Sequence, residues 1–160
     1  MTWFDVVAIL IVVVIAWAES IRGFGRALYD LVGALIATKV ALVLSVPLAE
    51  AAPVSDVSGP SEAFWLAVVF FILAILIVIA TKFIYESTLL SLDVLDPVLG
   101  ATFGIASGIL AAHVFLRSLA IAYAHTEFGA VVMASFMGQE LLEFRSYRAV
   151  IATLQNIGNW

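Results

Sequence analysis

The sequence of 160 residues has no cysteine and few charged residues, and each shortage excludes a class of protein. Without cysteine, the chain forms no disulfide, has no thiol nucleophile and binds no metal through thiolates. Charged residues make up 12% of the chain, where about a quarter is usual for a soluble domain. This is too little polar surface to cover a folded core of this size in water. An ordinary water-soluble globular protein is therefore excluded.

Basic residues are also scarce, since seven Lys and Arg stand against twelve Asp and Glu and give a net charge of −5. No basic cluster is present to neutralise phosphates, so we predict no nucleic-acid partner. His113 and His125 have no second His or carboxylate at metal-ligand spacing on their own helices, and no glycine-rich loop follows a strand. The sequence therefore predicts no metal and no cofactor.

Apolar residues are abundant, at 64% of the sequence with a mean hydropathy of +1.17. A bilayer core about 30 Å thick is crossed by roughly 20 apolar helical residues. We predict an all-α integral membrane bundle, a transmembrane domain over residues 1–117 with four spans at about residues 3–18, 28–48, 63–81 and 97–116. The second span is interrupted by Lys39 and ends near Pro47. The start of the chain lacks the basic leader of a cleaved signal peptide, so we expect the first span to be retained.

The basic residues of the short loops predict the orientation. Residues 19–30 contain Arg22 and Arg26, whereas residues 49–62 contain no Lys or Arg. Because positive charge is retained on the cytoplasmic side, the first loop is predicted to be cytoplasmic and the second to be outside. Both termini are then outside.

Residues 118–160 differ in character from the four spans. The apolar segment 118–138 is divided by His125, Glu127 and Gly129 into pieces too short to cross a bilayer, which predicts an interfacial or partly re-entrant segment. Six apolar residues then share one helical face and predict an amphipathic C-terminal helix: Phe144, Tyr147, Val150, Ile151, Leu154 and Ile157. This helix is expected to lie on the membrane surface, to pack across the mouth of the bundle or to bind a partner.

Small residues recur every fourth position in the fourth span, at Gly100, Gly104, Gly108 and Ala112. Spacing of this kind lets two helix backbones approach closely and gain dispersion contacts that lipid tails do not match. The second span has a similar face, formed by Gly33, Ala37, Ala41 and Ser45. We expect these helix-packing faces either to join spans two and four within one chain or to form a homo-oligomeric seam.

Lys39 is the outlier of the second span, because a lysine near the middle of a span costs about 2.5–3.5 kcal/mol on insertion scales. It is expected to be paired, to face water or to snorkel toward an interface. Asp5 and His113 are its candidate partners, and the three residues would together line a polar path. Alternatively, a tilted span places Lys39 away from the bilayer centre.

Catalytic motifs are absent from the sequence. Ser107 stands in a segment that superficially resembles an intramembrane serine protease, but Ile105 occupies the position where a glycine is expected. His113 is six residues further along the same helix, about 240° around it, and therefore does not reach the Ser107 hydroxyl as a general base. We predict that the protein is not an enzyme.

Two motifs, taken together, resemble those of a known family. A Trp-Phe-Asp start leads into the first span and is followed by residues 22–28 (RGFGRAL), and residues 95–104 (LDPVLGATFG) open the fourth span. Over about residues 1–150 the chain resembles the colicin V production protein family, the CvpA family of bacterial inner-membrane proteins. The residues that match the family's motif loops are Arg22, Gly23, Arg26 and Asp96. Ala27 replaces a glycine of the family pattern, and Pro97 replaces an arginine.

The resemblance implies a multi-pass protein of the bacterial inner membrane that is associated with colicin V production or export and with envelope homeostasis. The preferred hypothesis is a non-enzymatic accessory protein, whose amphipathic tail or Arg22–Arg26 loop docks a secretion or envelope protein. The second hypothesis is an oligomeric small-solute transporter or channel subunit, in which Lys39 lines a polar path. The second hypothesis requires assembly through the glycine face, because four short spans leave little room for a pore within one protomer.

Overall fold

The computed structural model describes residues 2–88, 95–143 and 145. This part of the chain is helical throughout and has no strand, with elements α1 (Trp3–Arg22), α2 (Phe24–Ala51), α3 (Ser58–Thr88), α4 (Asp96–Ala122), α5 (Glu127–Ala134) and α6 (Phe136–Leu142). The predicted all-α class is confirmed. The first four helices are each long and apolar enough to cross a membrane, so the chain is a multi-pass membrane protein.

The four long helices extend beyond the predicted spans, because hydropathy marks only the most apolar part of each helix. The second span is predicted to end near Pro47, and α2 itself continues through Pro47 to Ala51. Pro47 has no N–H to donate within the helix, and its ring crowds the carbonyl of the preceding turn. The fourth helix likewise runs to Ala122, past the predicted boundary at residue 117.

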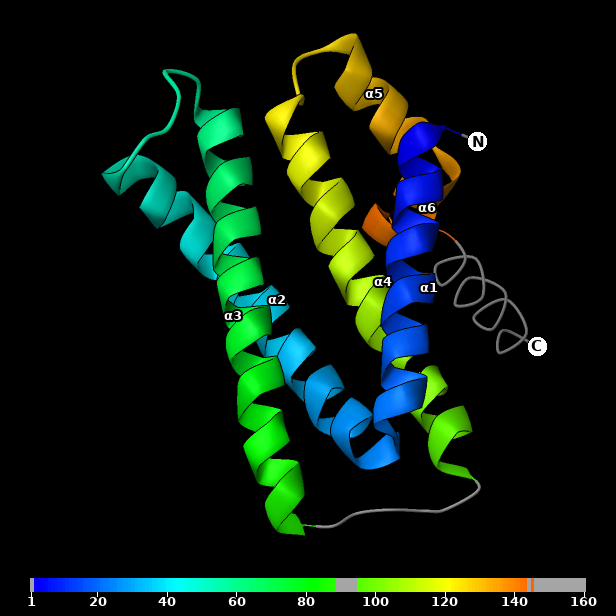
Figure 1. The fold of residues 1–160 in the computed structure, drawn as a ribbon. Coiled ribbons are helices and arrows are strands. Elements are labelled where there is room, and N and C mark those ends of the chain that lie inside the picture. The colour runs from blue at the N-terminus through cyan, green and yellow to red at the C-terminus, as the bar shows by residue number, and fades with distance from the viewer. Residues whose placement is uncertain (1, 89–94, 144, 146–160) are drawn as a thin grey trace, which may run out of the picture.

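α4 is the central helix, and each of the other five described helices contacts it. α1 packs along one side of α4, while α2 and α3 pack along the other (Figure 1). The turn between α1 and α2 is a single residue, Gly23, whose φ of 86° is one that glycine adopts without steric cost. α2 then crosses obliquely toward the opposite end of the bundle (Figure 1).

The glycine face of α4 packs on α1 and not on α2. A Cβ atom at Gly104 would lie 2.8 Å from the Ala16 Cα, and one at Gly108 would lie 2.7 Å from the Val12 Cα. Helix backbones that approach this closely leave no room for side chains between them. The predicted pairing of spans two and four through this face is therefore wrong, because α1 covers it.

The small-residue face of α2 is buried mainly against α3. A Cβ atom at Gly33 would collide with the side chain of Ile77 on α3. Ala37 and Ala41 belong to a buried cluster that draws two members from α3 and one from α4, namely Leu66, Phe70 and Val114. The second span therefore reaches α4 through larger side chains and not through the α4 glycines.

The short helices α5 and α6 fold back along α1 and α4 (Figure 1). Thr126 caps α5 by accepting a hydrogen bond from the Gly129 backbone N–H at 3.3 Å, and Ser135 caps α6 from the Gly138 N–H at 3.0 Å. The interruption predicted at His125, Glu127 and Gly129 therefore coincides with the start of α5, whereas the start of α6 was not predicted. Val132 is fully buried in a cluster with residues of α1 and α4. The predicted amphipathic helix over residues 144–157 lies outside the described residues.

Candidate functional site

A polar cluster joins three of the spans at the end of the bundle where α1 turns into α2. Arg22 Nη1 lies 2.8 Å from Glu19 Oε1 and 3.5 Å from Asp30 Oδ2. The Thr81 hydroxyl donates a hydrogen bond to Asp30 Oδ1 at 2.6 Å. These four residues, from α1, α2 and α3, are called the acidic cluster below. The cluster links the three helices by polar contacts within otherwise apolar surroundings.

The acidic cluster is buried and short of hydrogen-bond donors. Glu19 and Asp30 are 3% and 6% exposed, and a single guanidinium, that of Arg22, faces both carboxyl groups. Glu19 Oε2 is buried, and no residue in the described ranges donates a hydrogen bond to it. Buried carboxylates are normally paired at each oxygen, because removing an unpaired charge from water is costly. One carboxylate oxygen of this cluster is therefore left for a donor from outside it.

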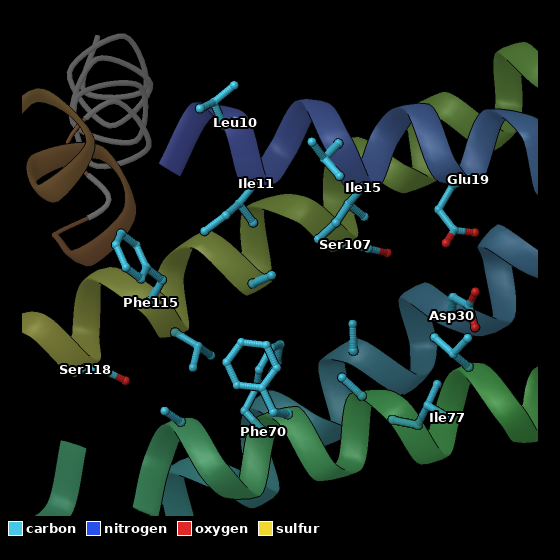
Figure 2. Close-up of a pocket in the computed structure, with 18 of the residues that line it drawn as sticks. Leu10, Ile11, Ile15, Glu19, Asp30, Phe70, Ile77, Ser107, Phe115 and Ser118 are labelled. Carbon is cyan, nitrogen blue, oxygen red and sulfur yellow. The ribbon is translucent and has the colours of Figure 1, made fainter. Parts of the chain in front are cut away.

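Glu19 and Asp30 stand at one end of an apolar groove of about 560 Å³ between α1, α3 and α4. Figure 2 shows both carboxyl groups at that end, with Ile11, Phe70 and Phe115 along the groove. The groove exists because α1 and α3 both pack on α4 but diverge from one another. Four alanines in its lining leave the volume open: Ala34, Ala67, Ala74 and Ala111. Since α1 and α3 both cross the membrane, the opening between them faces lipid.

Two serines also line the groove. The Ser107 hydroxyl donates to the Phe103 carbonyl oxygen of its own helix at 3.1 Å. Ser118 lies at the end opposite the acidic cluster (Figure 2), and its buried hydroxyl has no hydrogen-bond partner in the part of the chain that the structure describes. The strongest polar groups of the groove are therefore at one end only.

The two family-like motifs meet beside the acidic cluster. Asp96 Oδ1 accepts a hydrogen bond from the Phe24 backbone N–H at 3.2 Å, which satisfies a donor at the start of α2. Gly23, the residue before α2, has no side chain to cap the helix. A Cβ atom at Gly23 would lie 2.5 Å from Asp96 Oδ2. Asp96 thus caps α2 from the N-terminus of α4 and joins the fourth span to this end of the bundle.

Arg26, the remaining matched residue of the first motif, lies one turn into α2. It is half-buried, and its Nε atom is buried without a hydrogen-bond partner among residues 2–88, 95–143 and 145. Arg22 and Arg26 therefore differ in their surroundings, since the Arg22 guanidinium contacts two carboxyl groups.

Asp5, His113 and Lys39 do not form the predicted polar path. Asp5 accepts hydrogen bonds from the backbone N–H and hydroxyl of Thr2 and from the Met137 N–H at the start of α6. His113 Nδ1 donates to the Leu141 carbonyl oxygen near the end of α6 at 2.7 Å. Both residues hold α6 in place. Lys39 is exposed and does not line the groove, which leaves the alternatives that it faces water, snorkels toward an interface or lies away from the bilayer centre in a tilted span.

Glu19, Asp30 and Thr81 were not among the predicted site residues. Glu19 and Arg22 are three residues apart on one helix, a spacing at which side chains of opposite charge meet, and this signal was present in the sequence. The contacts of Asp30 with α1 and α3 depend on how the helices pack. In the described ranges, no group of three or more His, Cys, Asp or Glu residues is placed to hold a metal ion.

Comparison with known proteins found no protein-family model, no curated protein and no solved structure that matches the chain.

Proposed function

We propose that the protein is a non-enzymatic accessory protein of the bacterial inner membrane that holds another membrane component in the groove between α1, α3 and α4. The observation that carries this proposal is a preformed apolar groove, open to lipid, that ends at a buried carboxyl group with an unsatisfied oxygen. Ionisable residues inside membrane spans generally mark functional sites. A largely apolar pocket with a few polar groups at one place is the usual form of a ligand site.

The resemblance to the colicin V production protein family supports a role in toxin production or export and in envelope homeostasis. The motif residues Gly23 and Asp96 brace the end of the bundle that carries the acidic cluster. Arg22 and Arg26 lie at the same end, so the positive-inside rule favours placing it on the cytoplasmic side, with both termini outside.

The alternative function, an oligomeric transporter or channel subunit, has less support. A transporter of this kind requires a polar path that includes Lys39, but Lys39 is exposed on α2 away from the groove. It also requires assembly through the glycine face of α4, but α1 covers that face. The groove is a more direct candidate for a working site than either feature.

Filling the groove tests the proposed function. Ala111→Trp on α4 and Ala74→Trp on α3 each place an indole in the groove. Leu76→Trp is the matched control, because Leu76 is on α3 and 55% exposed away from the groove lining. We expect both groove variants, but not the control, to abolish toxin export or envelope integrity in a host that depends on the protein. Equal membrane levels and melting temperatures of the variants establish that folding is unaffected. Full activity of both groove variants would refute the proposal.

A further inference from the structure

We propose that the occupant of the groove is a single-chain amphiphile with a positively charged ammonium head, which donates a hydrogen bond to Glu19 while its hydrocarbon chain lies along α1. The inference rests on the proposed function, namely that the groove is a binding site. It adds the chemical class of the ligand and the residue that selects it.

The position of the head follows from the one-sided polarity of the groove. Glu19 Oε2 is buried, lines the groove and has no donor within the described residues. Among the described residues, the other buried side-chain atom of the lining without a hydrogen-bond partner is the Ser118 hydroxyl at the far end. An unpaired neutral hydroxyl costs far less than an unpaired carboxylate in an apolar setting. The head of a ligand therefore gains most at the Glu19 end.

The charge of the head follows from the balance of the acidic cluster. Glu19 and Asp30 contribute two carboxyl groups, and Arg22 is the one guanidinium that contacts them. Asp30 also receives the Thr81 hydroxyl, so the carboxyl oxygen that lacks a donor belongs to Glu19. An ammonium group supplies the donor that this oxygen lacks, in a charge-assisted hydrogen bond that a neutral head does not form. An anionic head would meet a carboxyl group of like charge.

The shape of the chain follows from the dimensions of the groove. Its α1 lining runs from Val7 to Glu19, a rise of about 18 Å at 1.5 Å per residue. The groove has a volume of about 560 Å³ over that length, and almost all of its lining is apolar. A single extended hydrocarbon chain fits a groove of this length and lining.

The position of the acidic cluster across the membrane agrees with a ligand whose head lies at Glu19 and whose hydrocarbon chain lies along α1. Glu19 is in the last turn of α1, which ends at Arg22, so its carboxyl group lies near one membrane interface. The groove leads from there toward the middle of the spans. An amphiphile in a bilayer has the same arrangement, with its head at the interface and its chain inside. It therefore enters sideways between α1 and α3 without turning over.

The test measures binding of three probes with the same chain and different heads, namely hexadecylamine, hexadecanol and palmitic acid. Native mass spectrometry of the full chain in phosphatidylcholine nanodiscs reports the bound fraction at matched mole ratios. We expect the amine to bind most tightly and Ala111→Trp to abolish binding of all three. Glu19→Gln, which keeps an oxygen for Arg22, should weaken amine binding on the order of tenfold to a hundredfold, the value of a charge-assisted hydrogen bond, and leave hexadecanol unchanged.

Glu50→Gln is the matched control, because it removes the same charge from an exposed position at the other end of α2. It should bind the amine like the unmodified protein. If Glu19→Gln fails to fold, Glu19→Asp keeps the charge but withdraws it by one methylene, and it should keep the preference for the amine at reduced affinity. Equal binding of the three probes overturns the inference. An unchanged preference for the amine in Glu19→Gln, or an undiminished affinity for the amine in Glu19→Asp, overturns it as well.

The outcomes also separate this inference from the proposed function. If no probe binds while the groove-filling variants still abolish activity in cells, the groove is used but its occupant is something else, such as a partner helix. The inference then fails and the proposed function stands. If no probe binds and the groove-filling variants are fully active, both fail.

Discussion

The Gly23–Asp96 junction yields the sharpest test of the fold. Gly23 has φ 86° and ψ 166°, a region that is essentially restricted to glycine, and a Cβ atom there would lie 2.5 Å from Asp96 Oδ2. Gly23→Ala should cost about 1–3 kcal/mol in backbone strain. It should also displace the Asp96 carboxylate from the Phe24 N–H, which costs a further 1.5–3 kcal/mol or so for a hydrogen bond to a charged group. The expected total is about 2.5–6 kcal/mol.

A double-mutant cycle separates these two effects. Asp96→Ala removes the same hydrogen bond and should cost about 1.5–3 kcal/mol. In the double variant the bond is lost once and not twice, so its cost should equal that of Gly23→Ala alone. The two single effects should therefore exceed the double effect by about 1.5–3 kcal/mol. Free energies of unfolding in mixed micelles measure each value. Additivity within about 0.5 kcal/mol would refute the claim that Asp96 caps α2 through this contact.

Three further predictions concern the acidic cluster, the exposed lysine and the state of assembly. Thr81→Val removes the donor to Asp30 Oδ1 and should lower the free energy of unfolding by about 1–3 kcal/mol. The control Thr102→Val, on the exposed side of α4, should change that free energy by less than about 0.5 kcal/mol. Equal effects of the two variants would contradict a stabilising role of the acidic cluster. Lys39→Met should insert as well as or better than the unmodified chain and keep its function in cells, and loss of solute flux with intact assembly would instead favour the transporter alternative. The particle in nanodiscs should have the mass of a monomer by native mass spectrometry, because both small-residue faces are covered within the chain, and a stable closed oligomer would count against this assignment of the faces.

The secondary structure was predictable because the hydropathy of a span is a local property. An 18-residue apolar window identifies a helix that can cross a membrane whatever it packs against. The break near His125, between α4 and α5, was predictable for the same reason, since polar residues interrupt the apolar run. The break at Ser135 was not predicted, and Gly129 lies inside α5. The continuation of α2 through Pro47 was not predictable, because a proline inside a helix disturbs the preceding turn and usually marks a kink or an end.

The packing partners were not predictable, because a small-residue face fits any helix that presents a smooth surface. Gly104 and Gly108 have the same spacing as the small residues of α2, yet they pack on α1. The single-residue turn at Gly23 separates α1 from α2, and α1 takes the place beside the α4 glycines. The acidic cluster was missed for a related reason. Glu19 and Asp30 flank that turn in the sequence and were interpreted as loop boundaries, whereas the turn folds both of them into the bundle.

The central position of α4 has a consequence for biogenesis. Every other described helix contacts α4, but α4 is the last of the four spans to leave the ribosome. During synthesis, α1 enters the bilayer without the helix against which its backbone later packs. α2 and α3, in contrast, have each other as packing partners before α4 is made. The residues of α4 that line the groove are in place only after that final insertion. A ligand that occupies the groove therefore binds completed chains and does not bind nascent ones.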